Sequence, residues 1–353
     1  MARNKLAVGL DIGSSGVKLV QLRERKGGYA LQAYGAAPLP PETVVEGALM
    51  NSSAIVAAIR GLVAEQKVRA REVAIGVRGH SVIIKKISVP RQTQEELDES
   101  IQFEAEQHIP FDIREVNVDA QILTPEGDAA GQMDVLLVAA KKEMINDYTA
   151  VCAEAGLTAT VVDVDAFAVQ NAYEANYESS PADTVVLVNV GAAVTNLNVL
   201  SRGATSFTRD VTMGGNAFTD EIQKQLNVSY AEAEALKVGG REGETDAVVP
   251  QEVERIIQGV AEQLAGEIQR SLDFYATTAA DGRVGRIFLS GGTARIPALF
   301  KVIEARAAVP VEILNPFKAI EVDDRRFDPA VILAAAPGAA VAVGLALRRA
   351  GDK

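Results

Sequence analysis

The sequence predicts an α/β fold of two related lobes, with a small α+β subdomain inserted into the first lobe. Segments with strand-like and helix-like patterns alternate along the chain, which favours mostly parallel central sheets. A glycine-bearing hairpin near the start is followed, about half a chain length later, by a second hairpin of the same form. Between the two hairpins lies a block with its own order of strand, helix, strand, strand and helix.

Composition limits the kind of protein and the kind of partner. The chain has 353 residues, 48% of them hydrophobic, which is enough for two buried cores. A net charge of −12 argues against nucleic acid and against a polybasic membrane anchor. Cys152 is the single cysteine and cannot form an intramolecular disulfide, and Met1 to Lys5 lack the apolar stretch of a signal peptide. We therefore expect a cytoplasmic protein whose partners are proteins or small ligands.

The two hairpins occupy equivalent places in the predicted lobes. The first runs from Leu6 to Leu22 and turns at Gly13-Ser14-Ser15-Gly16. The second runs from Val185 to Leu200, with Asn189-Val190-Gly191 where the first has Asp11-Ile12-Gly13. A single repeat of this kind indicates two related lobes and excludes a solenoid, which needs more copies.

The inserted block is expected over residues 79–157. Thr93 and Glu96 form a capping box at the start of its first helix, and Pro110 marks the end. Apolar residues at steps of four form one stripe along this helix: Leu97, Ile101, Ala105 and Ile109. A turn of the following hairpin is expected at residues 124–128. Lobe one then comprises residues 1–78, 158–183 and 331–353, and lobe two comprises residues 184–330.

The second half of the chain carries two long apolar segments. A helix is expected from about Gln251 to Thr277, with its apolar residues on one face, and a strand from Arg286 to Leu289 follows. The run from Ala330 to Leu347 is uncharged and about long enough to cross a membrane. It is rich in alanine and glycine and is interrupted at Pro337, so a buried helix is the favoured interpretation.

Most familiar enzyme signatures are missing from the sequence. There is no Walker loop, no Gly-x-Gly-x-x-Gly after a strand and no Gly-x-Ser-x-Gly elbow. Two histidines and one cysteine cannot supply a common zinc site.

The first hairpin offers an anion site. Its turn, Gly13, Ser14 and Ser15, can aim backbone N–H groups at a phosphate, and each such bond contributes about 1.5–3 kcal/mol. Asp11 is placed to hold a magnesium ion through water, and Lys18 can add a point charge. An ordinary hairpin stays open as the alternative for this segment taken alone.

Two glycine-rich segments follow the hairpins. They are Gly214-Gly215 and the strand end Ser290-Gly291-Gly292-Thr293-Ala294-Arg295-Ile296-Pro297. Glycine at the strand end lets the backbone approach a flat ring, on which Arg295 can stack. The order of hairpin, hairpin, glycine pair and glycine-rich strand end resembles that of the actin-like ATPase superfamily, which implies a duplicated, ribonuclease H-like two-lobe fold that binds ATP with Mg²⁺.

The resemblance implies a role for each segment. The phosphate hairpins match Asp11 to Lys18 and Asn189 to Leu197, the second including Gly191 and Thr195. The adenosine segment matches Gly291 to Pro297, and the two connecting helices match Asp163 to Tyr173 and Ala339 to Leu347. Glu234 and Lys237 match a pair that reaches the ribose and base in several relatives.

Within that superfamily, the segments Glu99 to Asp112 and Asp163 to Ala168 resemble the PilM family of the type IV pilus machinery. This resemblance implies an insertion placed as in FtsA, and a location in the cytoplasm at the inner face of the inner membrane. It also implies a scaffold or switch that captures the N-terminal tail of a PilN-like inner-membrane protein.

The second phosphate hairpin departs from its superfamily pattern. It begins with Asn189 where relatives have aspartate, so we expect at most a slow ATPase. Asp165 aligns with the residue that positions water in relatives and is the candidate catalytic residue, with a helix N-cap as the alternative. The rival assignments are an FtsA-like filament protein that bridges to a membrane, for which the basic C-terminal end is short, a sugar-kinase-like enzyme, and a DnaK-type chaperone, which needs a further domain.

Overall fold

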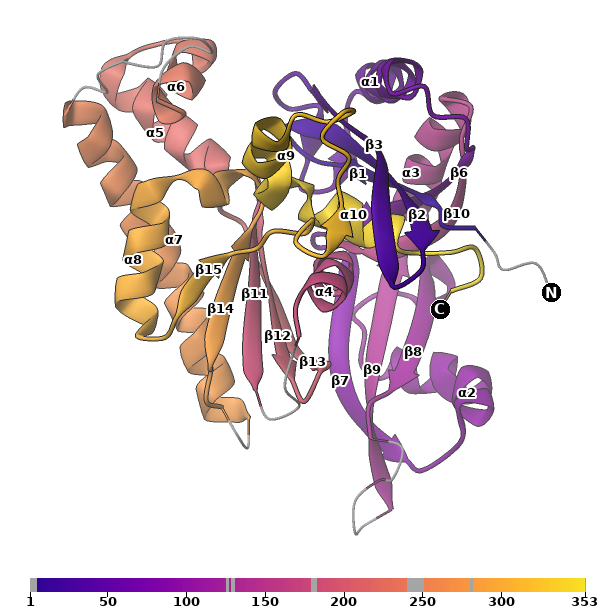
Figure 1. Cartoon of the computed structure of the whole chain (residues 1–353). Helices are drawn as coiled ribbons and strands as arrows, with labels where there is room; N and C mark the ends of the chain where they lie inside the picture. The colour runs from indigo at the N-terminus through magenta and orange to yellow at the C-terminus, as the bar shows by residue number, and fades with distance from the viewer. Residues whose placement is uncertain are drawn as a thin grey trace.

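The structure, a computed structural model, describes residues 5–124, 127, 131–178, 183–239, 251–279 and 282–352. Two large sheets form the centres of two lobes, and a smaller sheet lies below the first lobe in Figure 1. The described part of the chain therefore has the two lobes and the inserted subdomain that the sequence predicts.

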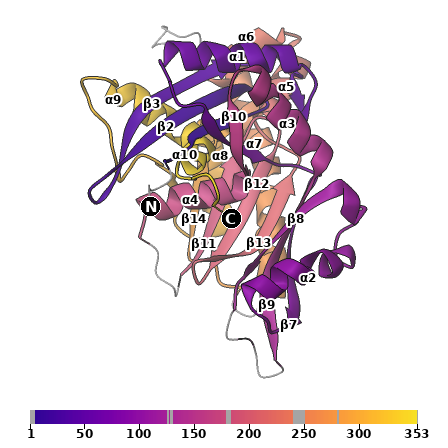
Figure 2. The ribbon, with the colours of Figure 1, turned by 90° about the vertical axis from the view of Figure 1, so that its right-hand side faces the viewer.

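The first lobe is built on a six-stranded sheet. Its strands, in spatial order, are β10 (Thr158–Val164), β6 (Glu72–Val77), β1 (Val8–Ile12), β2 (Gly16–Arg25), β3 (Gly28–Pro38) and β16 (Ile320–Glu321). β1 and β2 form the predicted first hairpin, and β1 pairs with β6 in parallel. Helices α1 (Ser52–Glu65) and α3 (Lys142–Glu154) pack on one face of this sheet through one apolar core. They lie side by side at the top of the lobe in Figure 2.

The second lobe repeats this plan around five strands. In spatial order they are β13 (Ala204–Val211), β12 (Thr195–Ser201), β11 (Thr184–Val190), β14 (Arg286–Ser290) and β15 (Val311–Ile313). β11 and β12 are the predicted second hairpin. Helices α7 (Gln251–Thr278) and α8 (Pro297–Ala307) share a core with one face of the sheet. Helices α5 (Gly215–Leu226) and α6 (Tyr230–Lys237) stand above this lobe (Figure 1).

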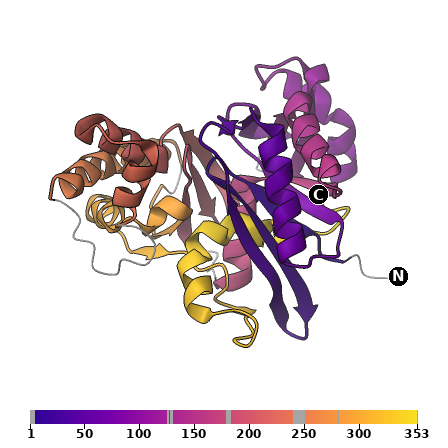
Figure 3. The ribbon, with the colours of Figure 1, turned by 90° about the horizontal axis from the view of Figure 1, so that it is seen from above.

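Two helices cross between the lobes, as the resemblance predicted for the connecting helices. They are α4 (Asp165–Asn176) and α10 (Ala340–Ala346), and they lie in the middle of the molecule in Figures 1 and 3. The backbones approach so closely that a Cβ on Gly344 would lie 1.7 Å from the carbonyl oxygen of Ala168. Only glycine fits at this crossing.

The apolar run near the C-terminal end folds into three short pieces rather than one long helix. They are α9 (Pro329–Ala335), a 3-10 turn (Ala336–Ala339) and α10. Among the described residues, the window 329–346 is the one that is long and apolar enough to cross a membrane, and 61% of it is buried inside the protein. All seven residues of α10 are buried, which confirms the predicted buried helix there.

The inserted subdomain is a three-stranded antiparallel sheet, β7 (Val82–Pro90), β9 (Gln132–Lys141) and β8 (Val116–Ile122), with α2 (Gln94–Glu106) packed on it. The capping box of Thr93 with Glu96 is confirmed. The helix ends at Glu106, before Pro110, although Ile109 beyond it is still buried. The predicted turn at residues 124–128 lies mostly outside the described residues.

Two of the predicted domain boundaries are wrong. α3 was assigned to the insertion, but its side chains Met144, Tyr148 and Cys152 are buried in the core of the first lobe. β16 was assigned to the second lobe, but it pairs in parallel with β3 in the first. The insertion therefore consists of the β7, α2, β8 and β9 unit alone.

Candidate functional site

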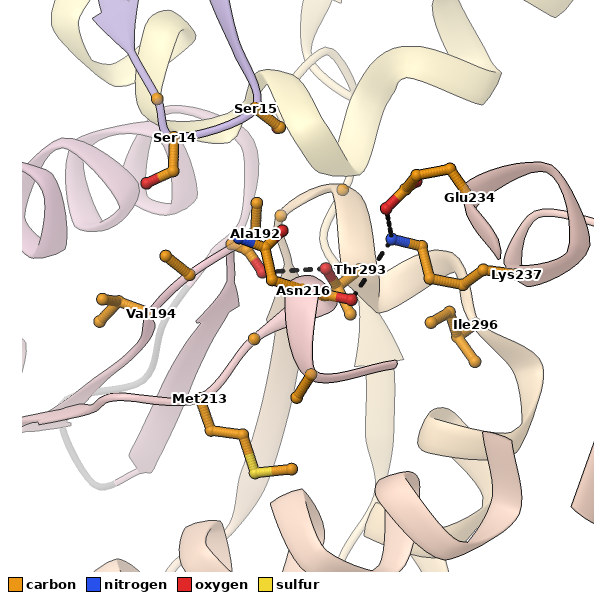
Figure 4. A pocket seen from close by; sticks show the side chains of 18 of the residues that line it. Ser14, Ser15, Ala192, Val194, Met213, Asn216, Glu234, Lys237, Thr293 and Ile296 are labelled. Carbon is orange, nitrogen blue, oxygen red and sulfur yellow. Dashed lines mark hydrogen bonds and ion pairs between the residues drawn. The ribbon is translucent and has the colours of Figure 1, made fainter. Parts of the chain in front are cut away.

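A cleft of about 1450 Å³ lies between the two lobes (Figure 4). Most of the site residues predicted from the sequence line it: Asp11, Gly13, Ser14, Ser15, Lys18, Asn189, Gly191, Gly214, Gly215, Glu234, Lys237, Gly291, Gly292 and Arg295. Two predicted residues do not line it, Thr195 and Asp165. Ser14 and Ser15 face the cleft from the first lobe, and Ala192 and Asn216 face it from the second.

The two hairpin turns have the same backbone closure. The amide of Gly13 donates to the carbonyl of Gly16 at 2.9 Å, and the amide of Gly191 donates to the carbonyl of Val194 at 3.0 Å. This equivalence at the atomic level matches the sequence repeat. Turns of this kind present further backbone N–H groups to an anion, so the cleft has a potential phosphate cradle on each wall.

The glycine pair at the start of α5 fixes that helix against the second hairpin. The amide of Gly215 donates to the carbonyl of Gly191 at 2.9 Å. A Cβ on Gly214 would lie 2.5 Å from the same carbonyl oxygen. The pair is therefore needed for the close approach of α5, whose positive end then faces the cleft.

The two glycines at the end of β14, Gly291 and Gly292, have different roles. Gly291 has a φ of +88°, and a Cβ there would lie 2.2 Å from the carbonyl oxygen of Val190, so this glycine is required by the backbone itself. No atom lies within 4 Å of the place where a Cβ on Gly292 would stand. Gly292 is the member of the pair with open space where a side chain would stand.

A polar network forms the end of the cleft near α6. The ammonium of Lys237 pairs with Glu234 and donates to the hydroxyl of Thr219 at 2.9 Å and to the carbonyl of Gly215 at 3.3 Å. Figure 4 shows Lys237 and Glu234 reaching from α6 toward the start of α5. Burial raises the pKa of the Asp220 carboxyl on the cleft wall, against the charge of Lys237. Thr219 was not predicted, although it stands one helical turn after Gly215 on α5.

At the other end of the cleft, Asp11 is held by two cations. Asp11 and Lys18 are direct partners across β1 and β2, and their side chains form an ion pair at 3.0 Å. Arg78 lies 3.6 Å from the other oxygen of Asp11. Burial raises the pKa of the Asp11 carboxyl, but Lys18 and Arg78 outweigh it and bring the pKa below its ordinary value. Asp11 is therefore ionised and already neutralised.

Arg78 is a cleft residue that the sequence analysis missed. It follows β6, lines the cleft, donates to the carbonyl of Ile12 and pairs with Asp165. A charged residue directly after a buried parallel strand was the available signal, since ligands bind at that edge of a sheet.

Asp165 lies behind Arg78 and is only 1% exposed. Burial raises the pKa of its carboxyl to about 6, against the opposing charge of Arg78. The alternative role as a helix N-cap is wrong, because α4 begins at Asp165 itself and Val164 occupies the N-cap position.

A chain of polar contacts leads from the second hairpin to the start of the insertion. Asn189 accepts from Ser290 at 3.2 Å and donates to Asn196 at 3.5 Å. Asn196 donates to Asp210 at 2.7 Å, and the other oxygen of Asp210 accepts from the backbone amide of Gly79 at 3.2 Å. The neutral Asn189 thus takes part in a chain of contacts between the second lobe and the start of the insertion.

Thr195 has a structural role. It is fully buried and its hydroxyl donates to the carbonyl of Met213 at 2.7 Å. The contact ties the second hairpin to the segment that precedes Gly214.

Comparison with known proteins identifies the family. The family model described as type IV pilus assembly protein PilM matches residues 9–350. The chain belongs to this PilM family. A solved PilM-PilN type IV pilus biogenesis complex is similar with a TM-score of 0.87 and 30% identity, covering 98% of this chain and 99% of that one.

More distant similarities show the fold alone. EutJ, an ethanolamine utilization protein from Carboxydothermus hydrogenoformans, has a TM-score of 0.58 at 15% identity, covering 98% of this chain and 90% of that one. MreB 5 of Spiroplasma citri, solved with bound AMPPNP, has a TM-score of 0.53 at 12% identity, covering 97% and 95%. Cell division protein FtsA of Streptococcus pneumoniae is 23% identical to this chain, and the match covers 90% of this chain and 77% of FtsA. The predicted actin-like fold is confirmed.

Proposed function

We propose that this member of the PilM family binds ATP between its lobes and acts as a nucleotide-dependent scaffold in type IV pilus assembly. The observation that carries the proposal is the convergence of two equivalent hairpin turns and the open glycine Gly292 on one cleft. A ligand that spans the cleft binds one arrangement of the lobes better than others, and this difference in affinity shifts their population.

Different lining residues would contact different parts of the nucleotide. The turns at Gly13 and Gly191 would donate backbone N–H groups to the phosphates, and Lys18 would add positive charge. Glu234 and Lys237 would reach the ribose and base. The ring would lie against Gly292, with Arg295 stacked on it.

The residues present do not form a metal site of their own. Asp11 is the carboxylate of the first hairpin, and two cations already pair with it. Within the described ranges, no three His, Cys, Asp or Glu side chains are grouped to hold a metal ion. Any Mg²⁺ would therefore come bound to the nucleotide phosphates and would reach Asp11 only through water.

Hydrolysis should be slow at most. Asn189 cannot supply the carboxylate of the second hairpin, and Asp165 is withdrawn from the cleft by its pairing with Arg78. A site that binds ATP but hydrolyses it slowly fits a scaffold controlled by ATP binding better than an enzyme that turns ATP over rapidly.

The proposed partner is the N-terminal tail of a PilN-like inner-membrane protein, met at the cytoplasmic face of that membrane. The similar solved structure is a PilM-PilN complex, which supports this partner. We place the tail along β7, an outer strand of the inserted sheet that lies near β13 of the second lobe. Extended peptides bind such edges through backbone hydrogen bonds and alternate side-chain pockets.

Two measurements test the proposal. Calorimetry with magnesium-ATP should show binding, and absence of both heat and a thermal shift at millimolar ligand refutes the nucleotide site. A synthetic PilN-like tail should bind the whole chain and lose affinity when the insertion between Val82 and Lys141 is replaced by a short linker. Magnesium-ATP binding by the shortened protein serves as the control for folding. Equal affinity of the tail for both forms would place the partner site elsewhere.

The FtsA-like alternative has one observation in its favour, the match to FtsA over 90% of the chain. It predicts filaments on lipid in the presence of ATP, which electron microscopy would detect.

A further inference from the structure

We propose that Arg78 takes over part of the charge neutralisation that a divalent metal gives to phosphates, so that this chain binds nucleoside triphosphate with little dependence on Mg²⁺. The inference rests on the proposed nucleotide site and assigns a phosphate-contacting residue to it.

Arg78 stands where the first phosphate cradle is. A Cβ placed on Gly13 would lie 3.9 Å from a terminal nitrogen of Arg78 and 3.8 Å from the ammonium of Lys18. Both side chains line the cleft. Any anion bound at the Gly13 turn therefore meets two cations, one from β2 and one from the end of β6.

The guanidinium is held in place before any ligand arrives. One terminal nitrogen donates to the carbonyl of Ile12, and the other pairs with Asp165. The side chain of Arg78 is 12% exposed and that of Asp165 is 1% exposed, so the carboxylate lies behind the arginine and the positive group faces the cleft. Asp165 is thus a positioning residue for Arg78. A pre-positioned guanidinium loses little rotamer freedom when it binds phosphate and matches its oxygens in pairs.

The charge around the cradle favours phosphate more than metal. Asp11 is paired with Lys18 at 3.0 Å and lies 3.6 Å from Arg78. A second divalent-binding carboxylate is missing at the opposite hairpin, where Asn189 is neutral and bonded to Ser290 and Asn196. The cations Lys18 and Arg78 and the carboxylates Asp11 and Asp165 balance in charge, so the cradle has no net negative charge to attract a magnesium ion. The N–H groups of the turn and of the two cations still suit phosphate oxygens.

The decisive measurement is calorimetry of ATP binding to the full chain, once with excess Mg²⁺ and once with EDTA. We expect the dissociation constant of the wild type to rise no more than about threefold on removal of the metal. In Arg78→Gln the affinity in EDTA should fall about tenfold or more, the range of one charge-assisted hydrogen bond, while added Mg²⁺ restores most of it. A wild type that binds ATP only with Mg²⁺ overturns the inference and leaves the proposed nucleotide site intact.

Further variants separate binding from folding. Asp165→Ala keeps the arginine charge but removes its hydrogen-bonding anchor, and should also raise the dependence of ATP binding on Mg²⁺. Asn189→Asp adds a negative charge on the opposite wall and should also raise the dependence of ATP binding on Mg²⁺. Arg325→Gln is a matched control, because the side chain of Arg325 is 91% exposed. It should leave the ratio of the dissociation constants for ATP with EDTA and with Mg²⁺ unchanged.

If Arg78→Gln does not fold, the wild type and Asp165→Ala still decide the matter, through the ratio of their dissociation constants for ATP with EDTA and with Mg²⁺. No binding of ATP by the folded wild type under either condition would instead refute the proposed function.

Discussion

Replacement of Gly292 by leucine should weaken ATP binding and leave the protein folded. No atom lies within 4 Å of the position of the new Cβ, and Gly292 is exposed on the cleft wall. A substitution without a clash should change the free energy of unfolding by no more than about 0.5 kcal/mol. The leucine side chain would then occupy space that the nucleotide ring needs. Overpacking of this size costs about 1–3 kcal/mol, which weakens binding about 5- to 150-fold.

The assay pairs calorimetry of magnesium-ATP binding with thermal unfolding. Gly61→Leu on α1 is the matched control, because Gly61 is also exposed and has no atom within 4 Å of its Cβ position. That variant should bind ATP as the wild type does. Gly291→Ala gives the opposite comparison: the positive φ and the 2.2 Å approach to Val190 predict a loss of stability above about 1 kcal/mol. A folded Gly292→Leu protein with wild-type affinity would refute the placement of the ring.

The remaining predictions concern hydrolysis, packing and pH. Wild-type turnover should stay below about 1 per second, and Asn189→Asp should raise any residual rate; a fast wild type would contradict the role of the missing acid. Gly344→Val should destabilise the protein by at least about 3 kcal/mol in denaturant unfolding, because its Cβ would lie 1.7 Å from the Ala168 oxygen, whereas Gly259→Ala on α7 should not. The pKa of Asp165 is raised from 3.8 to about 6 in the folded state, so its contribution to stability is complete below pH 3.8 and is lost as the pH rises through about 6. Asp165→Asn should flatten the pH dependence of unfolding between pH 4 and 6, and an unchanged slope would show that other groups produce it.

Most of the fold was predicted from patterns among residues that are close in sequence. Turn chemistry identified both hairpins, the capping box identified α2, and the spacing of apolar residues identified α7 to within one residue of its end. These features depend on neighbours in sequence, so one chain suffices to find them. The cleft itself was predicted only through the order of the glycine-rich segments.

The errors came from contacts between distant segments. α3 is amphipathic, but nothing in its own sequence says whether its apolar face belongs to the insertion or to the first lobe. β16 has two residues, too few to show a strand pattern. Arg78 and Asp165 acquire their roles from each other, across 87 positions of chain. The N-cap alternative for Asp165 was wrong because β10 runs into α4 with no intervening loop.

The hydrogen bond between Gly79 and Asp210 ties the base of the inserted subdomain to the second lobe. The insertion leaves the first lobe at Arg78 and returns to it at α3, yet its first backbone amide is bonded to β13 of the second lobe. A rotation of one lobe against the other must therefore either stretch this bond or carry the base of the subdomain along. The subdomain extends away from that point, and α2 lies well apart from helices α1 and α3 of the first lobe in Figure 2. A rotation carried through this bond would displace the far end of the subdomain more than its base.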